Sequence, residues 1–171
     1  MSDTLSSEIK ASLGWLFQDS LNLGTVVDSS LLEYRQLLAD GMLADQADKI
    51  WHDARTLPAG ASEDLVLSAL PLSLFGDSVV IALANVRAIL LINTATTAGE
   101  DLVVGGATSR EWRGPLVASG DRLIVPADSC LLVVNKKSGW PVVAGLSDKL
   151  RVSNSGSGDI TYKIAILGTS A

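Results

Sequence analysis

The chain has 171 residues, of which 47% are apolar and 19% are charged, and its formal net charge is −6. This length fits one domain, and the acidic balance disfavours a nucleic-acid groove because phosphate contacts need clustered Lys and Arg. A mean hydropathy of +0.33 is high for a soluble monomer, so part of the surface is expected to contact another chain.

The N-terminal region begins with a short irregular segment and continues with a regular alternation. Met1 to Lys10 contains no basic region followed by an apolar stretch, so no targeting signal is expected. Residues 1–7 are predicted to be a flexible segment that orders only on docking. From Glu8 to Gln18 apolar and polar residues alternate, which predicts a strand. The positions on its apolar side are Ile9, Ala11, Leu13, Trp15 and Phe17.

The segment from Leu31 to Leu38 fits two structures. Leu31, Tyr34 and Leu38 share one side of a helix, whereas Leu32, Tyr34 and Gln36 share one side of a strand. Periodicity alone leaves this segment undecided.

The most apolar part of the chain lies in its middle. Leu70 to Gly76 contains Pro71 and is interpreted as a packed connection. Val79 to Ile92 is the longest apolar run, and Asn85 and Arg87 interrupt it. Since a membrane-spanning helix needs about 20 apolar residues, this run is expected to form one or two core strands rather than a membrane anchor.

The rest of the chain predicts short strands separated by turns of Gly, Ser, Asn and Asp. These strands are expected at Leu102 to Val104, Leu116 to Val117, Leu123 to Val125, Cys130 to Val134, Trp140 to Val143, Leu150 to Val152 and Ile160 to Leu167. Many short strands joined by such turns are typical of a sandwich or barrel. The sequence therefore predicts an all-β protein, a jelly-roll-like antiparallel β-sandwich with a single domain over residues 8–171.

Catalytic, cofactor and metal sites are not predicted. His52 is the one histidine and has Asp53 beside it, but no nucleophile-elbow motif accompanies it. One histidine and one cysteine do not make a transition-metal shell. Cys130 precedes an apolar run, so a small buried thiol is expected there. The chain is accordingly interpreted as a protein that is not an enzyme.

Four tryptophans stand out against two tyrosines and two phenylalanines. Large aromatic residues dominate both cores and subunit interfaces, and exposed ones also serve as stacking platforms for sugars. Trp112 lies between charged neighbours, so Trp112 with Arg110 and Arg113 forms the candidate interface.

Several motifs resemble a known group of proteins. In the C-terminal half they are Ser138-Gly139-Trp140, Val143-Ala144-Gly145, Asp148-Lys149-Leu150-Arg151-Val152, Asn154-Ser155-Gly156 and Tyr162-Lys163-Ile164. Upstream they are Gln46 to Trp51, Arg55-Thr56-Leu57, Asp64-Leu65 and Val86 to Asn93. With these motifs the chain resembles small virion structural proteins of tailed bacteriophages, which include capsid decoration and cement proteins. It departs from their pattern at Leu70 to Phe75 and at Ser109 to Gly114.

The resemblance implies a decoration or cement protein that stabilises the head lattice through protein–protein interfaces. Its partners would be the major capsid protein and copies of itself, in a homotrimer, with no nucleic acid and no membrane. Its location would be the virion, after assembly in the host cytoplasm. The alternative is a tail or fibre-associated module that binds a host glycan or receptor through tryptophan-bearing loops.

Overall fold

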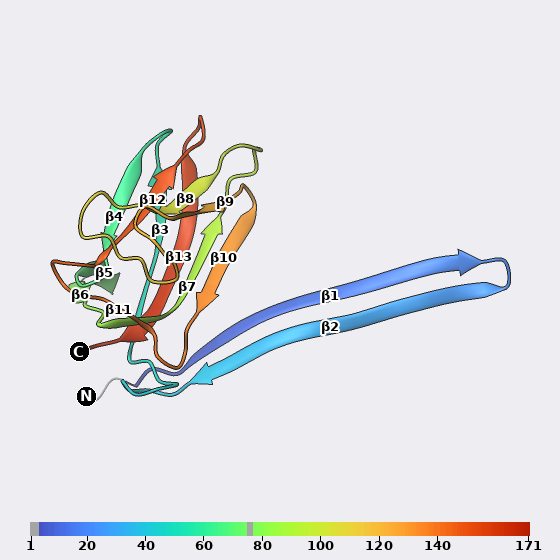
Figure 1. Cartoon of the computed structure of the whole chain (residues 1–171), viewed down its shortest axis with the longest axis horizontal. Helices are drawn as coiled ribbons and strands as arrows, with labels where there is room; N and C mark the ends of the chain where they lie inside the picture. Colours follow the sequence, from blue (N-terminus) through green and yellow to red (C-terminus); the bar gives the residue numbers. More distant parts are fainter. Residues whose placement is uncertain (1–3, 75–76) are drawn as a thin grey trace.

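A long two-stranded hairpin projects from a β-sandwich in the computed structural model of the chain (Figure 1). The structure describes residues 4–74 and 77–171. We call the hairpin the arm and the sandwich the body. The arm consists of β1 (Ser7–Leu21) and β2 (Gly24–Leu38), and the body begins at β3 (Lys49–Leu57).

Two antiparallel sheets make up the body. In spatial order, the larger sheet contains β10 (Ser129–Val134), β7 (Asn85–Asn93), β13 (Ile160–Thr169) and β3, with β11 (Trp140–Pro141) paired to β7. The smaller sheet contains β4 (Ser62–Val66), β12 (Lys149–Asn154), β8 (Leu102–Gly105) and β9 (Arg122–Val125). A separate hairpin is formed by β5 (Leu70–Leu74) and β6 (Asp77–Ile81).

Apart from β11, the strands of the two sheets pair in a nested order along the sequence. The first pairs with the last, β3 with β13, and the second pairs with the last but one, β4 with β12. Further inward, β7 pairs with β10 and β8 pairs with β9. All four pairings are antiparallel, so this part of the chain forms one long double strand that is wrapped over itself into two facing sheets.

The core lies between the sheets because each strand turns one side inward. On β13 the even positions from Ile160 to Ile166 are buried, whereas Thr161 and Lys163 are exposed, as the alternation predicts. The smaller sheet contributes Leu102 and Val152 to the same buried cluster. The two sheets therefore share one core.

The root of the arm packs on the outer side of the larger sheet. Ile9 and Leu38 are buried in a small cluster with Ala88 and Leu167, separate from the main core. Just beyond it, the N–H of Leu5 donates a hydrogen bond to Asp40 Oδ1 at 3.0 Å. The arm is thus attached to the body by few residues.

Arg87 holds the loop that follows the arm. Its guanidinium is buried, and it donates hydrogen bonds to the carbonyl oxygen of Leu43 at 2.9 Å and to that of Lys137 at 2.6 Å. Leu43 lies after β2 and Lys137 lies after β10, so one side chain ties these two loops together. This contact fixes the place where the arm leaves the body.

The prediction of an all-β, antiparallel, single-domain fold is confirmed. The undecided segment from Leu31 to Leu38 belongs to β2, with Leu32 and Tyr34 on one side of the strand. The apolar run from Val79 to Ile92 is divided between β6 and β7. The part of the chain described forms no helix, and therefore none long and apolar enough to cross a membrane.

Several details differ from the sequence-based expectations. Leu116 to Val117, expected to be a strand, lies in the loop between β8 and β9. The segment from Leu70 is β5 as far as Leu74, because it pairs with β6, and residues 75–76 lie outside the described residues. Cys130 is exposed, because the alternation of the edge strand β10 turns Leu131 inward instead. Of the expected flexible segment 1–7, residues 1–3 lie outside the described residues. Leu5 packs against the small cluster of Ile9 and Leu38 at the root of the arm.

Replacing Leu38 by Ala should loosen the arm from the body. Leu38 is 1% exposed, and truncation of a buried leucine lowers the free energy of unfolding by about 2–5 kcal/mol, with the lower end expected in so small a cluster. Its neighbour Leu37 is 62% exposed, so Leu37→Ala should change stability by less than about 0.5 kcal/mol. Denaturant unfolding and hydrogen exchange of the β1 and β2 amides measure both variants. Equal effects would contradict the described attachment of the arm.

Candidate interaction surface

The two faces of the arm differ in composition. Directly paired residues of β1 and β2 share a face, so the strand register assigns each side chain to one face. One face carries Ala11, Leu13, Trp15 and Phe17 from β1, and Val26, Leu32 and Tyr34 from β2. We call this set of side chains the arm stripe.

The arm stripe is exposed to solvent. Leu13, Phe17 and Leu32 are 67%, 64% and 68% exposed, and Trp15 is 45% exposed. Together the side chains of the stripe present on the order of 500 Å² of apolar surface. A contiguous apolar patch of that size is at the upper end of what monomers expose and is often functional, so the stripe is the candidate interaction surface. An isolated two-stranded hairpin is also only marginally stable in water, so the arm gains stability from whatever covers it.

The opposite face of the arm is charged near the root. Lys10 Nζ lies 3.1 Å from Glu33 Oε2, and Arg35 forms an ion pair with Glu8. These pairs join the strands diagonally, as neighbouring positions of an antiparallel pair allow. Exposed ion pairs each contribute at most about 1 kcal/mol to the free energy of unfolding. They stabilise the pairing of the two strands but do not replace a hydrophobic core. The exposed apolar residues on this face, nearer the tip, are Leu16, Val27 and Leu31.

The predicted contact residues Trp112, Arg110 and Arg113 do not form a surface patch. Trp112 is 1% exposed, and its indole Nε1 donates a hydrogen bond to the carbonyl oxygen of Pro141 at 3.0 Å. Its ring meets the ring of Trp140 edge to face, with 6.3 Å between the ring centroids. The prediction of Trp112 as an exposed contact is therefore wrong. Successive residues of an extended segment point to opposite sides, so Trp112 enters the core while Arg113 stays exposed.

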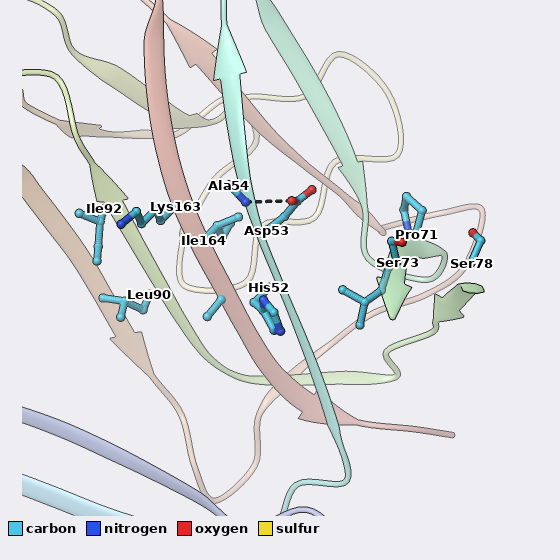
Figure 2. A pocket seen from close by; sticks show the side chains of 12 residues that line it. His52, Asp53, Ala54, Pro71, Ser73, Ser78, Leu90, Ile92, Lys163 and Ile164 are labelled. Atoms are coloured by element: carbon cyan, nitrogen blue, oxygen red, sulfur yellow. Dashed lines mark hydrogen bonds between the residues drawn. The ribbon is translucent and has the colours of Figure 1, made fainter. Parts of the chain in front are cut away.

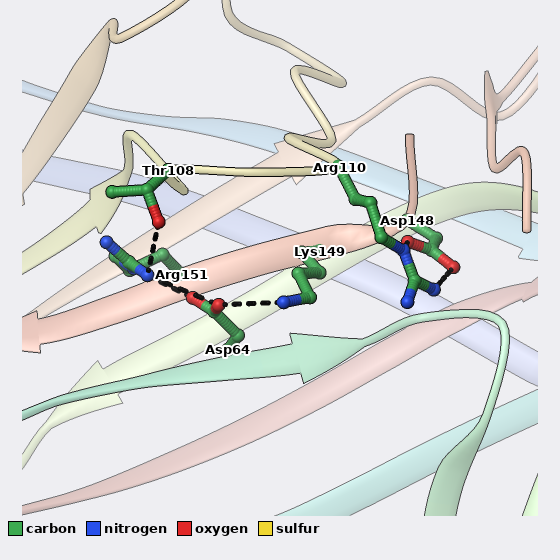
Figure 3. Close-up of polar contacts among 6 residues, drawn as sticks. All are labelled: Asp64, Thr108, Arg110, Asp148, Lys149 and Arg151. Carbon is green, nitrogen blue, oxygen red and sulfur yellow. Dashed lines mark hydrogen bonds and ion pairs between the residues drawn. The ribbon is translucent and has the colours of Figure 1, made fainter. Parts of the chain in front are cut away.

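Arg110 is engaged in an ion pair within the body (Figure 3). Its guanidinium binds both carboxylate oxygens of Asp148, with Nε 2.8 Å from Oδ1. The side chain of Asp148 is fully buried, and it also accepts hydrogen bonds from Ser68 Oγ at 2.7 Å and from the N–H of Gly145 at 2.9 Å. Burial alone raises the pKa of Asp148, but the hydrogen bonds from Arg110, Gly145 and Ser68 outweigh it and lower the pKa to about 2. Arg110 therefore compensates a buried charge.

His52 lies exposed on the outer side of β3, in an open groove (Figure 2). Within residues 4–74 and 77–171 it makes no hydrogen bond with a serine or a carboxylate, and its neighbour Asp53 instead pairs with Arg55 at 2.9 Å. The same residues contain no group of three or more His, Cys, Asp and Glu side chains placed to hold a metal ion.

The densest cluster of titratable groups joins the two sheets at one edge of the body. Tyr162 donates a hydrogen bond from its hydroxyl to Glu63 Oε1 at 2.7 Å, and Arg55 Nε donates one to Glu63 Oε2 at 2.6 Å. Burial, together with the hydrogen bond to Glu63, raises the pKa of Tyr162. Each group in this cluster has a partner, so the cluster serves to connect β3, β4 and β13.

Sequence reasoning identifies a strand in the arm but misses the arm as a functional element. An alternating strand is ordinarily assigned one buried side, but in the segment from Glu8 to Gln18 the apolar side is buried at Ile9 and exposed from Ala11 onward. The signal that could reveal the arm is its length. Two strands of 15 residues flank the short turn at residues 22–23, and both exceed the usual strand length of about 3–10 residues.

No protein-family model, no curated protein and no solved structure matches the chain. The fold and the arm stripe define a class, an all-β protein whose body carries a projecting arm with exposed aromatic and aliphatic side chains.

Trp112→Ala should destabilise the body. The loss of a buried tryptophan lowers the free energy of unfolding by about 3–5 kcal/mol, whereas Arg113→Ala, at an exposed position, should change it by less than about 0.5 kcal/mol. Denaturant unfolding compares the two variants. Unchanged stability of Trp112→Ala would show that this ring is not a core residue.

Acid should destabilise the body through Asp148. A carboxyl group whose pKa is lower in the folded state stabilises the fold above its unfolded pKa, and this contribution is lost as the pH falls from about 4 to about 2. The shift corresponds to at most about 2 kcal/mol, since Arg110 is partly exposed. Asp148→Asn should flatten the profile of stability between pH 4 and pH 2, measured by denaturant unfolding. Asp159→Asn, at an exposed turn, is the control, and an identical profile for both variants would contradict the assignment.

Proposed function

We propose that this chain is a virion structural protein of a tailed bacteriophage, a decoration or cement protein that stabilises the head lattice. In this proposal the body rests on the major capsid protein, the arm reaches a neighbouring subunit, and copies of the chain form a symmetric trimer. The role involves no chemical turnover, no nucleic acid and no membrane. The resemblance of the sequence motifs is the starting point, and the arm is the structural feature that supports it.

The observation that carries the proposal is the arm stripe. It projects from the body and exposes Trp15, Phe17 and Tyr34 beside aliphatic side chains. In specific interfaces, which remove about 1,600 Å² from water, a few aromatic anchors supply most of the binding energy. A lattice also holds its parts at high effective concentration, so each arm contact can be weak alone and still stabilise the shell.

The strand pairing of the body supports the predicted jelly roll. A jelly roll consists of eight strands in two sheets and contains two Greek keys. The nested pairing of β3 with β13, β4 with β12, β7 with β10 and β8 with β9 is the arrangement that such a fold requires. Viral capsid domains and lectins both use this fold, so it agrees with the main proposal and with the glycan-binding alternative.

The alternative, a tail or fibre-associated module that binds a host glycan or receptor, needs exposed aromatic rings for the glycan. Trp51 and Trp112 are buried and Trp140 is half-buried, which leaves Trp15 as the exposed tryptophan of the described chain. Trp15 lies in the arm stripe between Leu13 and Phe17, on the same side of β1. The apolar neighbours on β1 favour a protein partner, while Ser30 opposite Trp15 and Asp28, which accepts a hydrogen bond from the Trp15 indole at 3.4 Å, are the polar groups that a sugar would need.

Purified virions of the phage that encodes the chain test the proposal by electron cryomicroscopy. The expected result is many copies over the whole shell, in fixed ratio to the major capsid protein, with each arm lying over a neighbouring subunit. A few copies at a single vertex would favour the tail module. Absence of the chain from the particle would overturn both.

Phe17→Glu should weaken assembly. Loss of an aromatic anchor from an interface costs about 2 kcal/mol or more, which is about a thirtyfold loss of affinity. Gln18→Glu adds the same charge on the opposite face of β1 and should retain assembly. Sedimentation velocity of the free protein and co-sedimentation with particles that lack the chain measure the effect, and circular dichroism checks the fold. An equal loss in both variants would show that the stripe is not the contact.

A further inference from the structure

The outer side of the larger sheet carries a second apolar surface. Its side chains form rows across β10, β7, β13 and β3, because the strand registers align them. The row nearest the arm is Val134, Ala88, Leu167 and Ile50. The next row is Leu132, Leu90, Ala165 and His52, and the third row is Cys130, Ile92, Lys163 and Ala54. We call the second and third rows the sheet patch.

The root of the arm covers the first row. Ile9 is buried in one cluster with Ala88 and Leu167, and Ile50, Val134 and, from the second row, Leu132 pack against that cluster. Ile9 belongs to the same face of β1 as the arm stripe, since both occupy odd positions. Within one copy, the face of the arm that carries the stripe therefore packs, at its root, on the outer side of the larger sheet.

Much of the sheet patch is open to solvent, whereas Leu132 packs against the cluster at the arm root. Leu90 is 37% exposed, and Ala54 and Cys130 are exposed as well. Leu90 and Ile92 line an open groove of about 670 Å³, bounded on its far side by the β5–β6 hairpin (Figure 2). This groove continues from the surface that the arm root already covers.

Part of the outer side of the smaller sheet is charged and solvated, although Ile124 of β9 is also exposed on that side. There Asp64 pairs with Lys149 at 3.3 Å and with Arg151 at 2.7 Å (Figure 3). At the equivalent outward positions, β7 has Leu90 and Ile92 instead. The difference between the two sheets indicates that the sheet patch is a surface for protein contact.

We propose that the sheet patch binds the arm stripe of a second copy of this chain. The inference rests on the proposed assembly role and names the partner of the arm. The continuity of the two surfaces favours this pairing. Ile9 already packs on the first row, and the arm stripe continues along the same face of β1. The root of the same copy's arm borders the second row, where Ile9 and Lys10 line a groove with Leu90, but the strands of the arm then run away from the body (Figure 1).

The dimensions of the two surfaces fit each other. Two rows extend about 13 Å along the strands, and four strands extend about 19 Å across them. The ribbon of the arm is about 10 Å wide, and its stripe is about 25 Å long. The arm therefore fits when it lies across the strands, as sheets do in orthogonal packing. Each contact removes about 500 Å² from water on both sides together, which is less than a standard interface, so each contact is weak alone and a trimer depends on three formed together.

The charges of the two surfaces are complementary. The charged side chains on the stripe face of the arm are Asp19 and Asp28. In the sheet patch the charged side chain is Lys163, with the titratable His52 in the neighbouring row. Opposite charges across an interface fix its register and suppress wrong partners.

Disulfide mapping tests the pairing, because Cys130 is the single cysteine of the chain and lies in the sheet patch. Leu13→Cys, Trp15→Cys and Phe17→Cys, made one at a time in the full chain, add a thiol to the arm stripe. Ser12→Cys, Leu16→Cys and Gln18→Cys add one to the opposite face as matched controls. Mild oxidation of free protein and of virions, followed by peptide mass mapping, identifies the linked cysteines. At least one stripe variant should join Cys130 of another copy, with a yield at least tenfold above the controls.

The outcomes separate this inference from the proposed function. Links between two arm cysteines, with none to Cys130 in either sample, would overturn the sheet patch as the site and leave assembly through the arm intact. A monomeric chain that is absent from virions would overturn the proposed function itself. Leu90→Lys in the Phe17→Cys background should abolish the link to Cys130 while the melting temperature stays close to that of the parent. Retention of the link in Leu90→Lys would also contradict the patch.

Discussion

A two-stranded ribbon cannot bury its own side chains. A strand has two sides, and the body buries one side of each strand because a second sheet lies opposite it. The arm has no second sheet, so the stripe around Leu13 and Leu32 stays in water until another chain covers it. The body is stabilised by its own core, whereas the arm stripe has no covering sheet of its own, and in the proposed assembly a partner covers it. The proposed assembly role follows from this constraint.

The body supplies the arm with a fixed point of departure. Ile9 and Leu38 seat the root on the larger sheet, and the buried guanidinium of Arg87 ties the loop after β2 to the loop after β10. The nested pairing of the strands makes the sheet beneath this root continuous from β10 to β3. A rigid base of this kind lets a ribbon about 50 Å long present its apolar face in one direction.

An arm that lies on the sheet of a neighbour joins two different surfaces. Contacts of this heterologous type close into a ring when the rotation between copies permits it. Each contact is small, so a single pair of copies binds weakly, and the complete ring or a lattice makes several contacts at once. The ion pairs of Asp64 with Lys149 and Arg151 lie on the outer side of the smaller sheet, so the inference places the partner on the larger sheet.

The sequence by itself determined the kind of secondary structure, because alternation is a local property. The pattern from Ile160 to Ile166 was sufficient to predict a half-buried strand, and the turn residues were sufficient to predict an antiparallel all-β protein. Which side of a strand is covered depends on partners far away in the chain, as β13 depends on β3 and β7. For that reason only the tertiary structure placed Trp112 in the core, left Cys130 exposed, and turned the alternation of the first strand into a free apolar face.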